Sequence, residues 1–522
     1  MKKIIFLISL FLITIIAVNA EPVPEYEKAL DAMKQEMKRN MEQLKIDPFD
    51  PPFYIDYSME IFHNSNRGFS MGLPIYNSNS KYGNFNIRVK LGDYKDDEIS
   101  YTQDIYSTDF NNFEDDYRYY YIQAPISLDP ENIKFNLWSL TDFKYKKATD
   151  LSAKKKETLS LTKTSDKPVL PNFTKVPGHT HKEIKKFDDL DPDKLTETLK
   201  KLSKELSEQE EILTSACNLS ESVYTVFYIN SDGAEAYYNR RTISISFSAS
   251  TILPDGNPWG TSFSMSFIDN EKIDYAEIEK GFKEFLKNFK EYYHEAKELE
   301  SQYLGPVLYL GTEGPNYFSS YLSYIICSDR KAWEKNTLTL FDMLNKRILP
   351  SGTDVVDDPT LTKFKDTSVA NLPIDKEGVK PQKVTVVKNG YFKNFLTTKV
   401  PIENFPESNG HCMSFSETSY PGATNLIITS TQKKTNAQML NEMKNICREL
   451  GLENGVIFEN GFGYYYNVNT GKKTMIKNLN ESRKDSIRAL RDIKAFGNEQ
   501  FVYSYSGNNF VIISPSILVN DV

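Results

Sequence analysis

The chain has 522 residues, with 71 acidic and 63 basic side chains, a formal charge of −8 and 39% hydrophobic residues. This acidic balance argues against nucleic acid or an anionic membrane as a partner. The length exceeds what one hydrophobic core normally serves, so we expect two or three domains.

The N-terminus has the pattern of a cleaved export signal. Lys2 and Lys3 precede an apolar run over residues 4–18, and the triplet VNA at residues 18–20 supplies small residues before the expected cut. An uncleaved membrane anchor is the alternative, but the run is shorter than the ~20 residues that a spanning helix needs. We therefore expect residues 1–20 to be a signal peptide. The mature protein is then periplasmic or extracellular, with no membrane span left.

Residues 21–164 are expected to form an α+β region. Residues 24–46 predict an amphipathic helix in which Leu30, Met33, Met37, Met41 and Leu44 recur at three and four residues. This methionine stripe either packs against its own domain, the commoner case, or forms a docking groove. Strands are expected at residues 53–62, 69–75, 83–91 and 117–121. A further helix is expected over residues 142–167, and we interpret its run of lysines as a solvated face.

The segment 165–190 is rich in proline and is expected to be a linker. His179 and His181 lie in it, but no third metal ligand is close in sequence. The central region, residues 191–301, again predicts an α+β arrangement, with a hairpin around Ser231-Asp232-Gly233.

Residues 302–522 predict a mostly β domain with a few helices. A helix is expected over residues 333–348, and Asn389-Gly390 supplies the two positive-φ positions of a tight hairpin. The predicted fold class is therefore α+β, with an N-terminal α/β-type region followed by the mostly β C-terminal domain. The cysteines are scattered without a zinc-binding spacing, and disulfides remain open; they are Cys217, Cys327, Cys412 and Cys447.

Short fragments of the C-terminal half occur in an order that resembles the TldD/PmbA family, once called modulators of DNA gyrase and regarded as zinc metallopeptidases. The fragments are Gly305-Pro306-Val307-Leu308, Ile348-Leu349-Pro350, Val355-Val356-Asp357-Asp358-Pro359, Lys376-Glu377-Gly378-Val379, Ser408-Asn409-Gly410-His411, Pro421-Gly422-Ala423-Thr424-Asn425-Leu426 and Arg488-Ala489-Leu490-Arg491-Asp492-Ile493. The resemblance extends loosely over the mature chain.

Active members of that family carry a His-Glu-x-x-x-His motif on a helix and a C-terminal cysteine, which together bind one zinc ion. The corresponding residues here run from Thr312 to Tyr317, and only Glu313 matches the motif. No cysteine follows Cys447. The resemblance therefore implies that Glu313 is the remnant of a general base, that no zinc ligand is left and that no cofactor is expected. Pro315 predicts a helix over residues 315–326, with Thr312 and Glu313 in the preceding loop or cap.

The other candidate site residues are motif or peptide-binding positions: Thr312, Tyr317, Asn409, Gly410, His411 and Asn425. Three functions stay open. The first is an exported, non-catalytic protein that binds unfolded peptide segments, or accompanies an active subunit in a homo- or heterodimer with a family member. The second is an active metallopeptidase that cleaves unfolded peptides, with Glu313 as base and a rearranged metal centre held by Asp357, His411 or a cysteine. The third is a structural envelope protein.

Overall fold

The computed structural model describes residues 24–99, 124–161, 168–188, 192–298, 303–334, 340–415, 418–477, 486–505 and 510–520. The expected signal segment 1–20 and the strand expected at residues 117–121 lie outside these ranges. Within the ranges, the helices are too short or too polar to cross a membrane.

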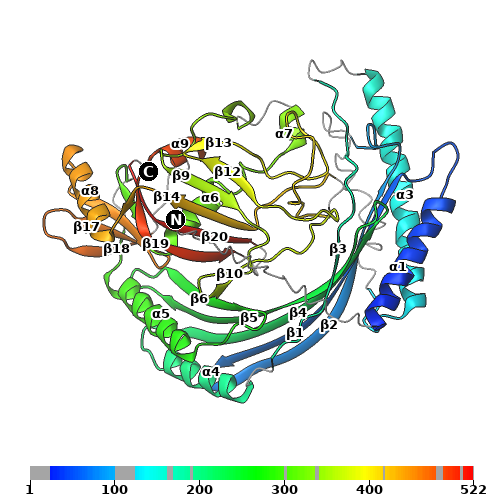
Figure 1. Cartoon of the computed structure of the whole chain (residues 1–522). Coiled ribbons are helices and arrows are strands. Elements are labelled where there is room, and N and C mark those ends of the chain that lie inside the picture. The colour runs from blue at the N-terminus through cyan, green and yellow to red at the C-terminus, as the bar shows by residue number, and fades with distance from the viewer. Residues whose placement is uncertain are drawn as a thin grey trace, which may run out of the picture.

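A strongly curved sheet organises the first half of the chain (Figure 1). Its strands are β1 (Tyr54–Ser70), β2 (Leu73–Lys90), β3 (Thr180–Glu183), β4 (Thr214–Asn230), β5 (Glu235–Ile252) and β6 (Pro258–Ile268). β2, β1, β4 and β5 are antiparallel neighbours in that order, and β3 and β6 both pair with β5. Strands from residues 21–164 and 191–301 thus share one sheet, and β3 comes from the segment expected as a linker.

β1 and β2 are longer than the sequence predicted, and the strand expected at residues 69–75 is wrong, because Met71 and Gly72 form the turn between them with φ values of 53° and 75°. Residues 63–68 and 76–82, expected as breaks, continue β1 and β2. Their polar side chains find partners on the neighbouring strand: Ser220 Oγ donates to Asn66 Oδ1 at 2.7 Å, and Ser222 Oγ donates to Asn64 Oδ1 at 2.7 Å. These cross-strand bonds satisfy side chains that otherwise favour turns.

Helices cover the convex face of the curved sheet (Figure 1), namely α1 (Pro24–Gln43), α3 (Pro130–Leu161), α4 (Pro192–Ser207) and α5 (Tyr275–Glu295). α1 and α3 enclose one core with the sheet, in which Met33 packs with Tyr57. α4 and α5 enclose a second, in which Leu199 packs with Phe282. The methionine stripe of α1 therefore packs against its own domain.

Helix α3 begins before the predicted start at residue 142, and one of its lysines does not lie on a solvated face. Lys155 is buried and donates to the Asp96 carboxylate at 2.6 Å and to the Asp97 carbonyl. For this lysine the interpretation of the run as solvated is wrong, because the acidic loop after β2 folds over it.

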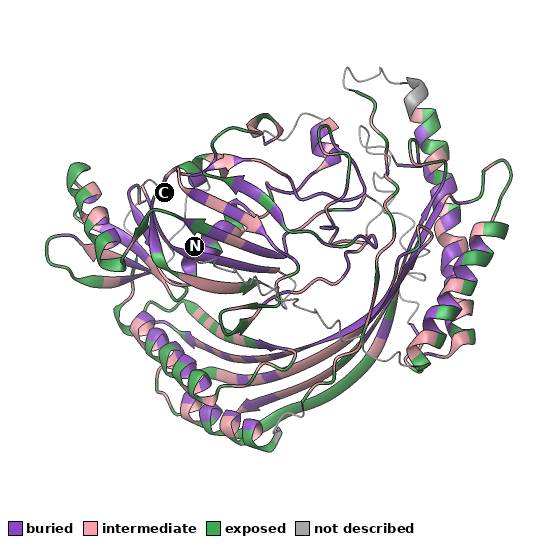
Figure 2. Ribbon diagram, in the orientation of Figure 1, coloured by how far each residue is buried: buried purple, intermediate pink, exposed green. Residues whose placement is uncertain are grey.

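The concave face of the curved sheet looks toward the C-terminal domain (Figure 1). Along the strands its side chains change in character. Asp56 pairs with Arg88 at one end, Phe62 lies beside Tyr224 farther along, and serine and asparagine, such as Ser220, follow toward β6. Many of these concave positions are intermediate or exposed, whereas those facing the helices are buried (Figure 2).

A second sheet forms the C-terminal domain. In the described part of the chain its strands are β7 (Lys297–Glu298), β8 (Val307–Tyr309), β9 (Thr353–Asp357), β12 (Val384–Lys388), β13 (Tyr391–Phe392), β14 (Asn425–Ser430), β15 (Lys433–Lys434), β16 (Asn454–Glu459), β17 (Phe462–Asn467), β18 (Lys473–Lys477), β19 (Ile493–Tyr505) and β20 (Phe510–Val519). β10 (Lys363–Phe364) and β11 (Thr367–Ser368) form a separate pair. The helical elements are α6 (Glu313–Tyr321), α7 (Arg330–Glu334), α8 (Asn436–Glu449), α9 (Ser486–Arg491) and the 3-10 turn η2 (Phe341–Met343). The predicted α+β class is confirmed.

The helix predicted over residues 333–348 is wrong. α7 ends its described part at Glu334, and only the short turn η2 follows within the described residues. Asn345 has a φ of 60°, which a right-handed helix does not allow, and Leu344 is already extended with a ψ of 128°. The Asn389-Gly390 hairpin is confirmed, with φ values of 50° and 79°.

All four cysteines are buried free thiols. Burial raises the pKa of Cys327 to about 12 and that of Cys217 to about 12, so both remain protonated at neutral pH.

Candidate functional site

Helix α6 carries the residues at the motif position. It begins at Glu313, two residues before the predicted start, and ends at Tyr321 rather than residue 326. Thr312 occupies the N-cap position but makes no capping hydrogen bond with its side chain. Pro315 is tolerated because it lies in the first turn, where backbone N–H groups have no helical partner.

Glu313 lies at the start of α6 and is 9% exposed. Its Oε1 accepts a hydrogen bond from the backbone N–H of Gly461 at 2.8 Å, and its Oε2 accepts from Asn316 Nδ2 at 3.4 Å. The carboxylate thus ties α6 to the turn between β16 and β17. Together with Thr312 and Asn316 it also borders a cavity of about 740 Å³.

Tyr317 points into the C-terminal core and not toward that cavity. It is 4% exposed, and its hydroxyl donates to the Ala489 carbonyl at 2.8 Å. Its ring packs on Tyr309 and Tyr321, with centroids 4.9 and 4.6 Å away. The residue at the position of the motif's second histidine is therefore part of the hydrophobic core.

Asn409, Gly410 and His411 form a buried turn. Asn409 accepts from the Thr397 N–H at 2.8 Å, and Gly410 has a φ of +77°. The His411 ring is fully buried: its Nδ1 is 2.8 Å from Asn409 Oδ1, and its Nε2 is 3.1 Å from Asp357 Oδ1. Both ring nitrogens are engaged, so this histidine holds the turn in place.

Asn425 holds a nearby loop in place. Its side chain is fully buried and donates to the carbonyl oxygens of Asp358, at 2.9 Å, and of Ala370. The residues around Asp357 thus form one group, and those around Glu313 form another. Within the described chain, Glu313 and His411 share no hydrogen bond.

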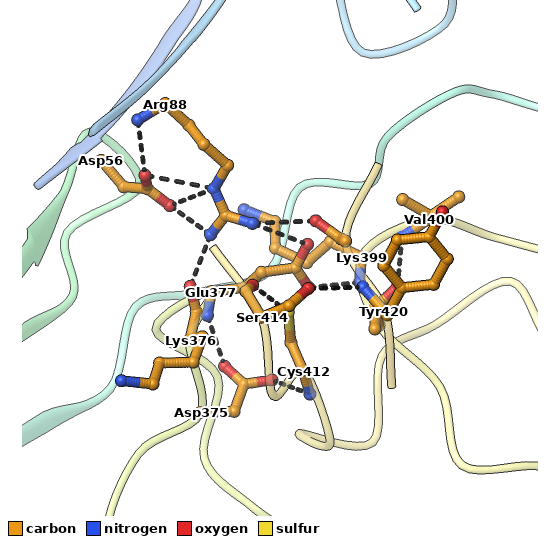
Figure 3. Close-up of polar contacts among 12 residues, drawn as sticks. Asp56, Arg88, Asp375, Lys376, Glu377, Lys399, Val400, Cys412, Ser414 and Tyr420 are labelled. Carbon is orange, nitrogen blue, oxygen red and sulfur yellow. Dashed lines mark hydrogen bonds and ion pairs between the residues drawn. The ribbon is translucent and has the colours of Figure 1, made fainter. Parts of the chain in front are cut away.

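A buried polar junction joins the curved sheet to the C-terminal domain (Figure 3). Arg88 Nε donates to both carboxylate oxygens of Asp56, at 2.9 and 3.2 Å. Arg88 also donates to Ser419 Oγ at 2.8 Å and to the Lys376 carbonyl, and its Nη1 is 3.8 Å from Glu377 Oε1. The guanidinium and both carboxylates are fully buried, so one arginine neutralises charges from both halves of the chain.

Burial in the junction shifts the pKa values of several of its side chains. Burial, with the charge of Glu377 beside it, raises the pKa of Asp375 to about 7. Burial also raises the pKa of Cys412, and it lowers the pKa of Lys399 although Asp232 pairs with that lysine. This junction was not predicted from the sequence. The available signal was one acidic and one basic side chain, Asp56 and Arg88, within two short predicted strands rich in aromatic and β-branched residues.

Models of a known family match most of the chain from residue 185 onward. The PmbA/TldA metallopeptidase central domain matches residues 185–289, and the PmbA/TldA metallopeptidase C-terminal domain matches residues 314–522. The chain belongs to the TldD/PmbA family. No curated protein matches it significantly by sequence.

Solved structures share the TldD/PmbA fold with this chain. A candidate modulator of DNA gyrase from Thermotoga maritima gives a TM-score of 0.59 at 15% identity, covering 94% of this chain and 99% of its own. TldE from Thermococcus kodakarensis gives a TM-score of 0.54 at 13% sequence identity, and the match covers 94% of this chain and 99% of TldE. A candidate modulator of DNA gyrase from Bacteroides thetaiotaomicron gives a TM-score of 0.53 at 13% sequence identity, and the match covers 95% of this chain and 97% of that protein. At these identities the likeness extends to the fold alone.

The residues present do not fit the zinc ion that the TldD/PmbA motif implies. Thr312 offers a neutral hydroxyl, and the Tyr317 phenol is bound to a core carbonyl. Glu313 alone provides a charged oxygen there, whereas zinc sites use three protein ligands or more. Nowhere in the described ranges do three His, Cys, Asp or Glu side chains gather as a metal site. These residues therefore give no route to a zinc-activated water.

Proposed function

We propose that this chain is an exported, non-catalytic member of the TldD/PmbA family that binds extended peptide segments. In this proposal it acts as a companion subunit, in a homo- or heterodimer with a family member. The observation that carries the proposal is the engagement of the motif residues: Glu313 accepts from Gly461, and Tyr317 donates into the core. Side chains used in this way stabilise the fold and leave no ligand set for catalysis.

The edge of β6 supports peptide binding. In the part of the chain that the structure describes, β6 pairs only with β5. The cavity of about 740 Å³ runs along its other edge, where both Ser262 and Phe263 line it although they belong to opposite faces of the strand. An extended peptide can add to such an edge by backbone hydrogen bonds, with little dependence on its sequence.

The first experiment tests the loss of catalysis. We expect the purified full chain, incubated with zinc and then dialysed, to retain well below one zinc per chain in elemental analysis. We also expect it to leave an unfolded peptide uncut. One tightly bound zinc per chain would overturn the proposal, as would a chelator-sensitive cleavage that Glu313→Gln abolishes.

The second experiment tests strand addition. A labelled unfolded peptide is titrated with the full chain by fluorescence anisotropy, next to the same peptide methylated on alternate backbone nitrogens. Methylation removes the N–H donors and leaves the side chains, so it should weaken binding by roughly ten-fold or more. Equal binding of both peptides would contradict strand addition. Absence of binding by either, with no family member copurifying from the native extract, would favour a structural envelope protein.

A further inference from the structure

A second cavity, of about 760 Å³, lies between the concave face of the curved sheet and the C-terminal domain. Phe62, Tyr224 and Arg240 line it from β1, β4 and β5, and Phe415 lines it from the opposite domain. Tyr324, which is 69% exposed, lies at its rim. Its volume falls within the range of known small-ligand sites.

Arg240 is the feature that points to a ligand. It is only 7% exposed, and among the described residues its side chain makes one hydrogen bond, from Nη1 to the Asn371 carbonyl at 2.6 Å. Among the described residues, no carboxylate lies within 4 Å of its guanidinium. Buried charges are normally paired, because an unpaired one loses its hydration without compensation. The remaining N–H groups of Arg240 are therefore suited to an anion in the cavity.

The other charges in the cavity set the charge of that anion. Glu60 and Lys376 both line the cavity and form an ion pair in direct contact, so their charges cancel. Arg240 is left as one net positive charge. A single carboxylate balances it, whereas a phosphate dianion would leave one negative charge unopposed in a largely buried site.

Aromatic rings surround the charged groups. Phe62 stacks on Tyr82 and on Tyr224, with centroids 5.0 and 6.1 Å away. Across the cavity, Phe415 lies under the ammonium group of Lys376 at 4.5 Å. Walls of this kind favour a ligand with an aromatic or large apolar side chain beside its carboxylate.

The two cavities are neighbours along the same loop and strand. Ser368 and Val511 border the one beside β6, whereas Ala370 and Phe510 border the one at Arg240. A peptide lying along β6 can therefore end in the Arg240 cavity. We propose that this cavity binds the C-terminal residue of the peptide, with its carboxylate on Arg240 and its aromatic or apolar side chain between Phe62 and Phe415. This inference rests on the proposed peptide binding and adds a specificity for free C-termini.

The test uses the full chain and one unfolded peptide ending in phenylalanine, as free acid and as amide, titrated by fluorescence anisotropy. On the unmodified chain the free acid should bind roughly ten-fold to a hundred-fold more tightly than the amide. Arg240→Gln should remove this preference, bringing the free acid to the affinity of the amide. Arg347→Gln is the matched control, because Arg347 hydrogen-bonds Tyr391 in the C-terminal domain and borders neither cavity. It should keep the full preference.

A second variant should strengthen binding of the free acid. A gain in affinity cannot be explained by misfolding, so this variant keeps the proposal testable if Arg240→Gln fails to fold. Glu60→Gln releases Lys376 from its ion pair and should tighten binding of the free acid while leaving the amide unchanged. 3-Phenylpropanoate alone should compete only weakly. Strong competition by this small acid would overturn the assignment to a peptide end. Equal binding of acid and amide on the unmodified chain would overturn this inference alone, whereas binding of neither form would overturn the proposed function as well.

Discussion

Replacing Arg88 by methionine gives the sharpest test of how the two halves of the chain are held together. Arg88 lies in β2, and its partners are Asp56 on the neighbouring strand, together with Ser419 and Glu377 from the C-terminal domain. Methionine keeps the aliphatic volume but removes the charge and every side-chain donor, while the backbone N–H of residue 88 still donates to Asp56. Asp56 and Glu377 are then left buried with no cation within 4 Å among the described residues.

The expected loss in free energy of unfolding follows from the burial of Arg88 and its two carboxylate partners. Arg88, Asp56 and Glu377 are each fully buried, and Glu377 Oε1 already lacks a hydrogen bond among the described residues. Removal of one partner from a buried ion pair costs about 3–5 kcal/mol, because the remaining charge stays desolvated. Arg88→Met should therefore lower the free energy of unfolding by about 4 kcal/mol at neutral pH. Asp56→Asn in the same chain should restore at least about 2 kcal/mol of that loss.

Urea unfolding under reducing conditions, followed by tryptophan fluorescence, measures the single and double variants. The loss in free energy of unfolding caused by Arg88→Met should be smaller at pH 5 than at pH 8. In the variant, a buried Asp56 without its ion-pair partner takes up a proton in the folded state. A loss below about 1 kcal/mol, or strict additivity of the two substitutions, would refute the reasoning.

Three further predictions concern stability. Burial raises the pKa of Asp375 to about 7 and that of Glu98 to about 8, so the folded state holds their protons more tightly than the unfolded chain. Stability should fall as the pH rises from about 4 to about 8, and Glu98→Gln should flatten the upper part of a pH series of urea titrations. Gly314→Ala should cost about 1–3 kcal/mol or more, because its Cβ would lie 2.2 Å from the Pro515 carbonyl oxygen; an unchanged Tm would contradict this. Thr435→Ala removes the capping box of α8 and should cost about 1 kcal/mol in urea unfolding, a neutral result arguing against the cap.

The long strands show where local sequence patterns fail. Asn64 and Asn66 have poor strand propensity and are typical of turns, so the sequence predicted breaks there. Their partners, Ser222 and Ser220, lie more than 150 positions away in the chain. By contrast, the alternation of serine with apolar residues along β5 is visible locally, because one of its faces packs on α5 and the other does not.

Between Thr312 and Tyr317 the sequence indicated that the zinc-binding histidines of the family motif are replaced. It did not indicate which contacts the residues present there make. The Tyr317 hydroxyl is satisfied by Ala489, and Glu313 by Gly461, both far along the chain. The predicted helix start near Pro315 was two residues late, since the rule that places proline at the first helical position also allows it elsewhere in the first turn. Arg240 could not be identified as a candidate from the sequence, because the lack of an ion-pair partner depends on tertiary contacts.

The junction and the Arg240 cavity are mechanically linked through one residue. The Lys376 carbonyl accepts from Arg88, whereas the Lys376 side chain pairs with Glu60 inside the cavity. Arg88 therefore fixes the backbone from which the cavity's second cation projects. If Arg88→Met still folds, it should weaken the preference for a free peptide C-terminus without changing any residue that lines the cavity. If Arg88→Met loses stability but keeps the full preference for the free acid, the ion pair with Glu60 is sufficient to position Lys376.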